Sequence, residues 1–212
     1  MVISAECAVQ PHDLLWGLSA AALPTDAPSW VSEMLGLDQP VVVRRAQVAA
    51  GWVAVGVRGR TRDQRYATTM KLGDITRRVR PEQLTRAVDP QDERWPALRA
   101  LQHIQPVMDA LGLPWGVAGS VGFALATGVS VLHQDSDLDL IVRTEHFFSR
   151  QAAAKVVCAL QGAECRVDVQ LQTPLGAVAL REWAGSARQV LLKAEDGARL
   201  VSDPWSLLEA SA

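Results

Sequence analysis

Valine-rich runs dominate the first ninety residues and have the spacing of paired β-strands. Residues 40–43 and residues 52–57 are two such runs, and Gly51 lies between them. β-Branched side chains favour extended backbone, and a short glycine-containing segment between two such runs is typical of a hairpin. The pattern therefore predicts paired strands with a turn near residues 49–51. Residues 77–81 are expected to form an exposed connector.

The pattern changes after residue 90. Apolar residues at helical spacing predict a helix from Leu98 to Leu111, and Ser149 can cap a second helix over residues 152–160. Three short apolar runs are expected to be strands: residues 115–118, 138–142 and 166–171. Strand, loop, strand, helix and strand in this order predict an α/β arrangement for the second half.

One uncharged segment has the length of a membrane span. Residues 110–134 contain no Asp, Glu, Lys or Arg, but they include five glycines and Pro114. Glycine and proline in this number disfavour a single membrane-spanning helix. We therefore expect a buried strand followed by a glycine-rich loop, and no membrane partner.

The length and the two patterns together predict two small domains. The chain has 212 residues, and domains usually hold ~100–200. Pro90 disfavours helix in the residue before it, so residues 88–92 are the expected boundary. The first domain, residues 1–90, is expected to be small, mixed and β-rich, and the second, residues 91–212, to be α+β or α/β.

The net charge of −2 conceals a basic segment. The chain has 21 Lys and Arg against 23 Asp and Glu, a balance that excludes a strongly basic nucleic-acid-binding protein. Within residues 44–80, only two acidic residues oppose ten basic ones: Arg44, Arg45, Arg58, Arg60, Arg62, Arg65, Lys71, Arg77, Arg78 and Arg80. Two interpretations remain open: a solvated strand face with turns, or a surface that binds a polyanion and is relieved of self-repulsion by it.

The cysteines and the N-terminus favour a cytoplasmic protein. The three cysteines form no CxxC pair, so neither a disulfide framework nor a thiolate zinc site is expected. The first ten residues lack a basic region and contain Glu6, which disfavours a secretion signal.

Three carboxylates lie on strands predicted to be neighbours. Asp137 and Asp139 are two residues apart at a predicted strand, so they point the same way while Leu138 and Leu140 point into the core. Asp168 lies on the polar face of a later strand. If the two strands are adjacent, the carboxylates converge on an oxygen-only site suited to Mg²⁺. The alternatives are a solvated edge strand and, for Asp168, a structural pair with Arg166.

Gly119 and Ser120 follow a short apolar strand in the same half of the chain. Glycine lets the backbone approach a ligand closely, and a hydroxyl beside free backbone N–H groups suits a phosphate oxygen. Other phosphate and calcium motifs are absent from the sequence. An EF-hand loop fails because Leu140 and His146 stand where glycine and glutamate are required. There is no GxGxxG and no GK[ST].

Gly119-Ser120, Asp137-x-Asp139 and a later strand aspartate resemble the nucleotidyltransferase superfamily related to DNA polymerase β. Sixteen residues separate Ser120 from Asp137, more than is usual in that superfamily, so the loop over residues 125–133 is expected to be extended. More narrowly, the whole chain resembles the phosphoribosyl-dephospho-CoA transferases of bacterial malonate decarboxylase, also called its holo-acyl-carrier-protein synthases. The segments that carry this resemblance are residues 11–16, Arg44-Arg45, residues 136–142, residues 173–177 and Glu182-Trp183.

The resemblance implies a polymerase β-like catalytic domain after a small substrate-binding or carrier-binding domain. It implies that a serine of the acyl-carrier subunit attacks the α-phosphate of 2′-(5″-triphosphoribosyl)-3′-dephospho-CoA, and that pyrophosphate leaves. Asp137, Asp139 and Asp168 would be the catalytic residues and would hold Mg²⁺, as two ions in the expected scheme. The other implied contacts are with substrate: Gly119, Ser120, Arg44, Arg58, Arg60 and Lys71.

Two alternatives differ from this activity in class. One is a nucleotidyltransferase that moves a nucleoside monophosphate from a nucleoside triphosphate to a small molecule or protein. The other is a binding module that keeps the fold without catalysis. ATP turnover without the carrier would favour the first, and the absence of Mg²⁺-dependent ligand binding would favour the second.

Overall fold

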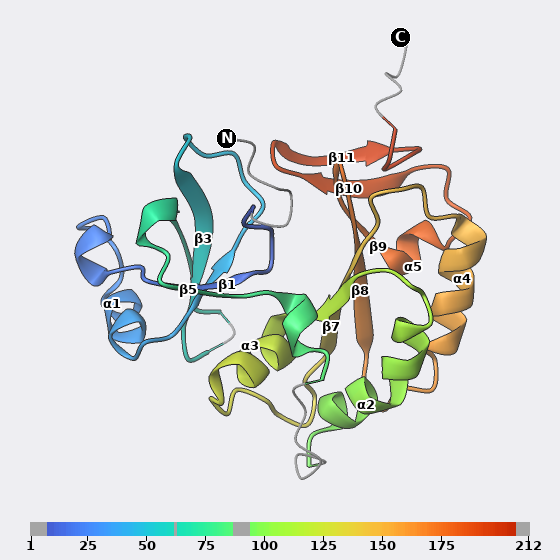
Figure 1. Cartoon of the computed structure of the whole chain (residues 1–212), viewed down its shortest axis with the longest axis horizontal. Helices are drawn as coiled ribbons and strands as arrows, with labels where there is room; N and C mark the ends of the chain where they lie inside the picture. Colours follow the sequence, from blue (N-terminus) through green and yellow to red (C-terminus); the bar gives the residue numbers. More distant parts are fainter. Residues whose placement is uncertain (1–7, 62, 87–93, 207–212) are drawn as a thin grey trace. The chain divides into compact units, whose positions relative to one another are not determined.

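A computed structural model describes residues 8–61, 63–86 and 94–206 and divides the chain into two compact units. The first unit ends at Arg80 and the second begins at Pro81. The boundary expected over residues 88–92 lies outside the described residues. The division between the two units falls several residues earlier in the chain. Each unit contains one sheet (Figure 1).

The first unit is a five-stranded antiparallel sheet with one α-helix. Its strand order is β4-β3-β2-β1-β5, and β2 pairs with β3 as the sequence predicts. The elements are β1 (Leu14–Trp16), α1 (Ser29–Gly36), β2 (Val41–Val43), β3 (Trp52–Arg58), β4 (Arg65–Lys71) and β5 (Arg77–Val79), with short 3₁₀ turns at Ala20–Ala22 and Leu72–Asp74. The predicted turn is confirmed, because the Trp52 amide donates to the Ala49 carbonyl across 3.1 Å.

The expectation that residues 77–81 form an exposed connector was wrong for its first part. Arg77–Val79 is an edge strand, paired with β1 from Leu14↔Val79 to Trp16↔Arg77. The Arg77 guanidinium lies over the Trp16 ring, 4.3 Å from its centroid. A run of arginines carries no apolar alternation, so the pattern does not reveal a strand whose partner is some sixty residues away.

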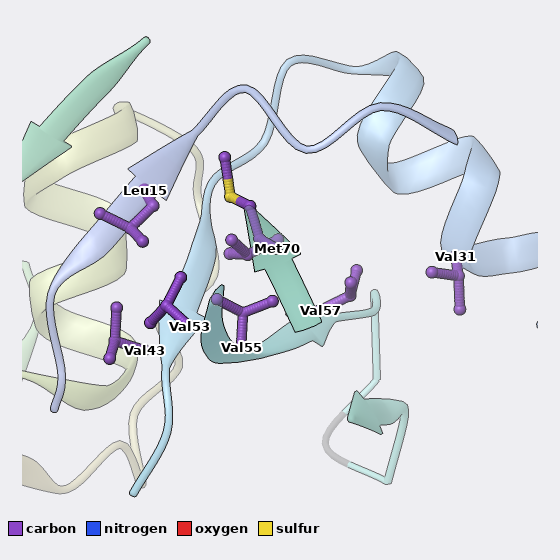
Figure 2. Close-up of a cluster of buried hydrophobic side chains, with 8 residues drawn as sticks. Leu15, Val31, Val43, Val53, Val55, Val57 and Met70 are labelled. Atoms are coloured by element: carbon purple, nitrogen blue, oxygen red, sulfur yellow. The ribbon is translucent and has the colours of Figure 1, made fainter. Parts of the chain in front are cut away.

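One face of this sheet forms the hydrophobic core of the first unit. Figure 2 shows Val53, Val55 and Val57 of β3 together with Met70 of β4 and Leu15 of β1. Val31 of α1 belongs to the same cluster and is fully buried. The odd-numbered residues of β3 therefore face the core, and its even-numbered residues face the opposite side.

A buried ion pair links the start of this unit to β5. The Asp13 side chain is 0% exposed, and its Oδ2 lies 2.7 Å from Nη2 of Arg78. The same oxygen accepts the Gln10 amide across 2.8 Å. The positive charge of Arg78 is therefore paired with a buried carboxylate of the same unit.

The second unit is a six-stranded mixed sheet with helices. Its strand order is β11-β10-β9-β8-β7-β6, with β7 and β8 parallel and the other pairs antiparallel. After a 3₁₀ turn at Pro81–Leu84, the elements are α2 (Pro96–Asp109), β6 (Trp115–Val117), α3 (Gly119–Thr127), β7 (Leu138–Arg143), α4 (Arg150–Ala159), β8 (Val167–Thr173), β9 (Gly176–Ala179), α5 (Leu180–Trp183), β10 (Val190–Ala194) and β11 (Gly197–Val201). Figure 1 shows α3 beside β7 and α4 beside α5.

The local predictions for this unit are confirmed except at one segment. Ser149 caps α4, because its Oγ accepts the Ala152 amide across 3.1 Å. The glycine-rich loop expected after β6 is instead the helix α3, and only the part after its left-handed C-cap Gly128 is a loop. The packing of α3 explains Gly122: a β-carbon there would lie 2.6 Å from the Val117 carbonyl, so α3 lies too close to β6 for a side chain at this position. The described residues contain no helix with the length and hydropathy of a membrane span.

Candidate active site

Asp139 and Asp168 lie side by side at the start of two parallel strands. They are register partners in β7 and β8. Their strand neighbours Leu138, Leu140 and Val167 are buried, whereas both aspartates are half-buried. Alternation thus directs the two carboxylates to the same face of the sheet, away from the core, as the sequence predicts.

Gly119 brings the start of α3 against the same carboxylate. The Ala118 amide donates to the Asp139 carbonyl across 2.9 Å, which ties the turn before α3 to β7. The φ angle of Gly119 is +61°, a left-handed value that favours glycine. A β-carbon at this position would collide with the Asp139 carboxylate. The following residue, Ser120, is half-buried in the first turn of α3.

Asp137 lies immediately before β7 and is half-buried. The turn that leads to it is held by Ser136, whose Oγ accepts the His133 amide across 3.0 Å. The Ser136 amide in turn donates to the His133 carbonyl across 3.1 Å. His133 is exposed and contributes its backbone to this turn.

Asp168 is paired with Arg166, which lies two residues before it on the same strand face. Nη2 of Arg166 is 3.0 Å from Oδ2 of Asp168, and its Nε donates to Oδ1 across 3.2 Å. This two-point pairing is the structural alternative that the sequence allowed for Asp168. The sequence indicates this pairing because Arg166 stands two residues before Asp168, and residues two apart in extended backbone point to the same side.

The carboxylates fit a magnesium site by their chemistry. Carboxylate oxygens are the ligands that Mg²⁺ prefers, and Asp139 and Asp168 present them from adjacent strands. Within residues 8–61, 63–86 and 94–206, however, no three His, Cys, Asp or Glu side chains come close enough together to hold a metal ion. Arg166 already pairs with both oxygens of the Asp168 carboxylate.

Cys165 lies next to this site. Burial raises the pKa of its thiol, and the charges of Asp137 and Glu164 act in the same direction, whereas a backbone hydrogen bond with Leu138 lowers it. At neutral pH the group is a protonated thiol. It therefore offers neither a thiolate ligand nor a nucleophile to the carboxylates.

The basic residues named in the sequence belong to the first unit. Arg44 follows β2, and a β-carbon at Gly56 would lie 3.2 Å from its Cδ, so its alkyl chain passes over this glycine. Arg58 is the register partner of Arg65 across the β3–β4 hairpin. Arg60 is exposed in the turn beyond this pair, where its amide donates to Oε1 of Gln64 across 2.9 Å. Lys71 lies over the Trp52 ring, with Nζ 5.6 Å from the centroid.

Arg62, which belongs to the same basic segment, lies outside the described residues. The sequence marks Arg65 only as one of the ten basic residues of this segment and Trp52 only as part of a predicted strand. The register that places them on one face with Arg58 and Lys71 was not available from the sequence.

Two family models match this chain one after the other. The phosphoribosyl-dephospho-CoA transferase MdcG N-terminal domain matches residues 10–81, and the corresponding C-terminal domain matches residues 83–204. The chain belongs to the phosphoribosyl-dephospho-CoA transferase family. The family expected from the sequence is confirmed, and this member of it is a transferase enzyme.

Relatives of this transferase cover its whole length. A phosphoribosyl-dephospho-CoA transferase of Pseudomonas syringae pv. tomato is 58% identical over 211 residues, which is 100% of both chains. One from Azotobacter vinelandii is 54% identical and covers 92% of this chain and 94% of its own. One from Pseudomonas aeruginosa is 49% identical, with 96% and 97% covered. No solved structure matches the chain significantly.

Proposed function

We propose that this transferase moves 2′-(5″-phosphoribosyl)-3′-dephospho-CoA from its 5″-triphosphate precursor to a serine of the acyl-carrier subunit of malonate decarboxylase. One structural observation carries the proposed site: Asp139 lies between Gly119 on one side and Asp168 on the other. Family membership supports the transferred group. The odd number of cysteines and the coenzyme A-derived substrate favour the cytoplasm as the compartment.

We propose that the second unit is a polymerase β-like nucleotidyltransferase domain, and the order of its elements supports this. A short strand, β6, leads through Gly119-Ser120 into α3, and the aspartates follow at the start of β7. The third aspartate lies on β8, parallel to β7. The first unit, residues 1–80, is the proposed binding domain for substrate or carrier.

The backbone around Gly119 and the hydroxyl of Ser120 are the proposed contacts of the departing phosphates. The missing β-carbon at residue 119 lets the backbone lie directly against the Asp139 carboxylate, and backbone N–H groups in such turns can bind anions. Asp137 and Asp139 would hold Mg²⁺, with Asp168 as a further ligand. When bound, Mg²⁺ supplies positive charge that stabilises the entering and the leaving oxygens of an in-line displacement.

Asp168 is the proposed acceptor of the serine proton. The serine Oγ forms a bond to the α-phosphorus, and the bond from this phosphorus to the oxygen that bridges to the β-phosphorus breaks. The electron pair leaves with pyrophosphate, and the proton moves to a carboxylate oxygen of Asp168. Arg166 holds this carboxylate in place before substrate binds, by two hydrogen-bonding nitrogens.

Arg44, Arg58, Arg60 and Lys71 are proposed to bind anionic groups of the substrate or the carrier. All four are on the first unit, and Arg44, Arg60 and Lys71 are exposed to solvent. Exposed positive charge attracts anionic ligands from solution.

A direct assay tests the proposal. The chain is incubated with Mg²⁺, the triphosphoribosyl precursor and the apo carrier, and intact-mass spectrometry then follows the carrier while pyrophosphate is measured. We expect the carrier to gain the mass of the phosphoribosyl-dephospho-CoA group with one pyrophosphate released per carrier. ATP turnover without the carrier would instead favour another nucleotidyltransferase, and the absence of any product or ligand binding would favour a non-catalytic module.

A further inference from the structure

One face of the β3–β4 hairpin in the first unit is basic and largely exposed along β4, although Ala54 of β3 on the same face is buried. Val53, Val55 and Val57 point into the core, so Trp52, Gly56 and Arg58 belong to the opposite face. Their register partners on β4 are Lys71, Ala67 and Arg65, and all three are exposed. We call this surface the hairpin face, and it consists of Arg44, Trp52, Arg58, Arg65, Ala67, Thr69 and Lys71.

Positive charge is arranged along the hairpin face without acidic residues among it. Residues 40–71 contain one acidic residue, Asp63, which is exposed in the turn beyond the Arg58–Arg65 pair and is not part of the hairpin face. Arg58 and Arg65 are directly opposite each other at one end, an arrangement of like charges that destabilises a sheet by itself. Arg44 adds a third guanidinium nearby, because its side chain crosses Gly56 in the adjacent register position. The face thus concentrates charge that an anionic partner would neutralise.

Two side chains of the hairpin face are held in place by the protein. Nη1 of Arg65 donates to the Gln64 carbonyl across 3.0 Å. Lys71 lies over the Trp52 ring at the other end, and this ring is 39% exposed. Cations that are already positioned lose less conformational entropy when a partner binds.

The hairpin face is longer than the triphosphate group of the precursor. The Arg58–Arg65 pair lies six residue steps along the strand from the Trp52–Lys71 pair, which corresponds to about 20 Å at ~3.3 Å per residue. A triphosphate, built from three linked tetrahedra, is far shorter than this. An α-helix of about 13 residues has the same length, so acidic side chains on one helix face can meet both ends together.

We propose that the hairpin face docks the acceptor protein of the transfer reaction through an acidic surface about one helix long. This inference rests on the proposed function for the identity of the acceptor. The triphosphate is then bound by other residues, and neutralising the hairpin face weakens recognition of the carrier while recognition of the coenzyme precursor is preserved. Because the attraction is electrostatic, it also weakens as ionic strength rises.

Charge reversal tests this docking surface. Arg65→Glu and Lys71→Glu place acid at opposite ends of the face, and Lys71→Gln is a milder variant in case Lys71→Glu does not fold. Arg188→Glu is the matched control, because Arg188 is exposed on the second unit and undergoes the same change of charge. Circular dichroism establishes that each variant is folded before it is compared.

Two measurements are made on the full chain. Fluorescence anisotropy of labelled apo carrier, with its acceptor serine replaced by alanine, gives the Kd of docking without any chemistry. Steady-state kinetics gives KM separately for the carrier and for the precursor. We expect Arg65→Glu and Lys71→Glu to raise the carrier Kd and KM by about 10-fold or more at low salt, with the precursor KM and the Arg188→Glu values unchanged.

The remaining outcomes overturn the inference. An unchanged carrier Kd in both charge-reversal variants, or a wild-type chain that does not bind the carrier, excludes the hairpin face as the docking surface. A rise in the precursor KM alone assigns the face to the triphosphate instead. Failure of the proposed function can be distinguished from failure of the docking surface. A wild-type chain that binds the carrier in the anisotropy measurement but shows no transfer in the kinetic assay contradicts the proposed function alone.

Discussion

The carboxylate of Asp139 occupies the space that a side chain at Gly119 would need. The two residues are held by the turn from β6 into α3 on one side and by β7 on the other, and a hydrogen bond from the Ala118 amide to the Asp139 carbonyl joins them. Asp139 is also the register partner of Asp168. A small backbone change at residue 119 therefore acts directly on the proposed catalytic carboxylates.

Gly119→Ala is expected to abolish most activity. The new methyl group has to displace the Asp139 carboxylate, and a displacement of ~1 Å in an active site can lower the rate ~100-fold. The left-handed backbone adds a cost of about 1–2 kcal/mol to folding, since φ is +61°. Carrier mass gain per minute measures the first effect, and urea denaturation measures the second.

Gly128→Ala is the matched control for this variant. Gly128 has φ of +71° at the end of the same helix, but a β-carbon there would meet nothing within 4 Å. We expect a similar loss of about 1–2 kcal/mol in stability and a rate close to wild type. Equal losses of activity in the two variants would show that backbone strain, and not contact with Asp139, is responsible.

Asp13→Ala is expected to destabilise the first unit. Asp13 is completely buried and paired with Arg78 across 2.7 Å, so its removal leaves a guanidinium without this partner in a mostly buried position. Breaking a buried pair in this way costs about 3–5 kcal/mol. The comparison is Asp196→Ala, which removes an exposed pair with Arg199 and should cost less than ~1 kcal/mol. Urea denaturation of both variants gives the two values, and equal midpoints would contradict a structural role for Asp13.

The two described cysteines are expected to differ in reactivity. Cys158 is exposed, whereas Cys165 is half-buried and burial raises the pKa of its thiol. The thiolate is the reactive form, so iodoacetamide should modify Cys158 first at neutral pH, as peptide mass mapping would show. The raised pKa also makes the free energy of unfolding depend on pH. The contribution of Cys165 is fully present below the pKa of the unfolded thiol and is lost as the pH rises from there through the pKa of the folded thiol. Faster modification of Cys165 than of Cys158 would contradict its described environment.

Local patterns were sufficient for much of the fold. The β2–β3 pairing follows from valine-rich runs on either side of Gly51, and the cap of α4 follows from the position of Ser149. Alternation was also sufficient to place Leu138 and Leu140 inside and Asp139 outside. These features depend on residues close together in the chain, so the local pattern of apolar and polar residues is enough to predict them.

Features that depend on distant partners were not accessible in the same way. The helix α3 was missed because glycine has a low helix propensity, whereas the close approach of Gly122 to the Val117 carbonyl makes glycine necessary there. The edge strand β5 was missed because its pairing with β1 leaves no mark on its own sequence. For the site, the residue types indicated which carboxylates to consider, but only the register of β7 and β8 pairs Asp139 with Asp168 and only the ion pair reveals Arg166.

The most direct test of the proposed site is the intact mass of the carrier after reaction with Asp139→Asn. This variant keeps the size of the side chain next to Gly119 and removes its charge, and Asp196→Asn serves as the control on an exposed turn. We predict that the carrier keeps its apo mass with Asp139→Asn and gains the phosphoribosyl-dephospho-CoA group with Asp196→Asn at the wild-type rate. A carrier fully modified by folded Asp139→Asn at the wild-type rate would contradict the assignment of catalysis to this carboxylate.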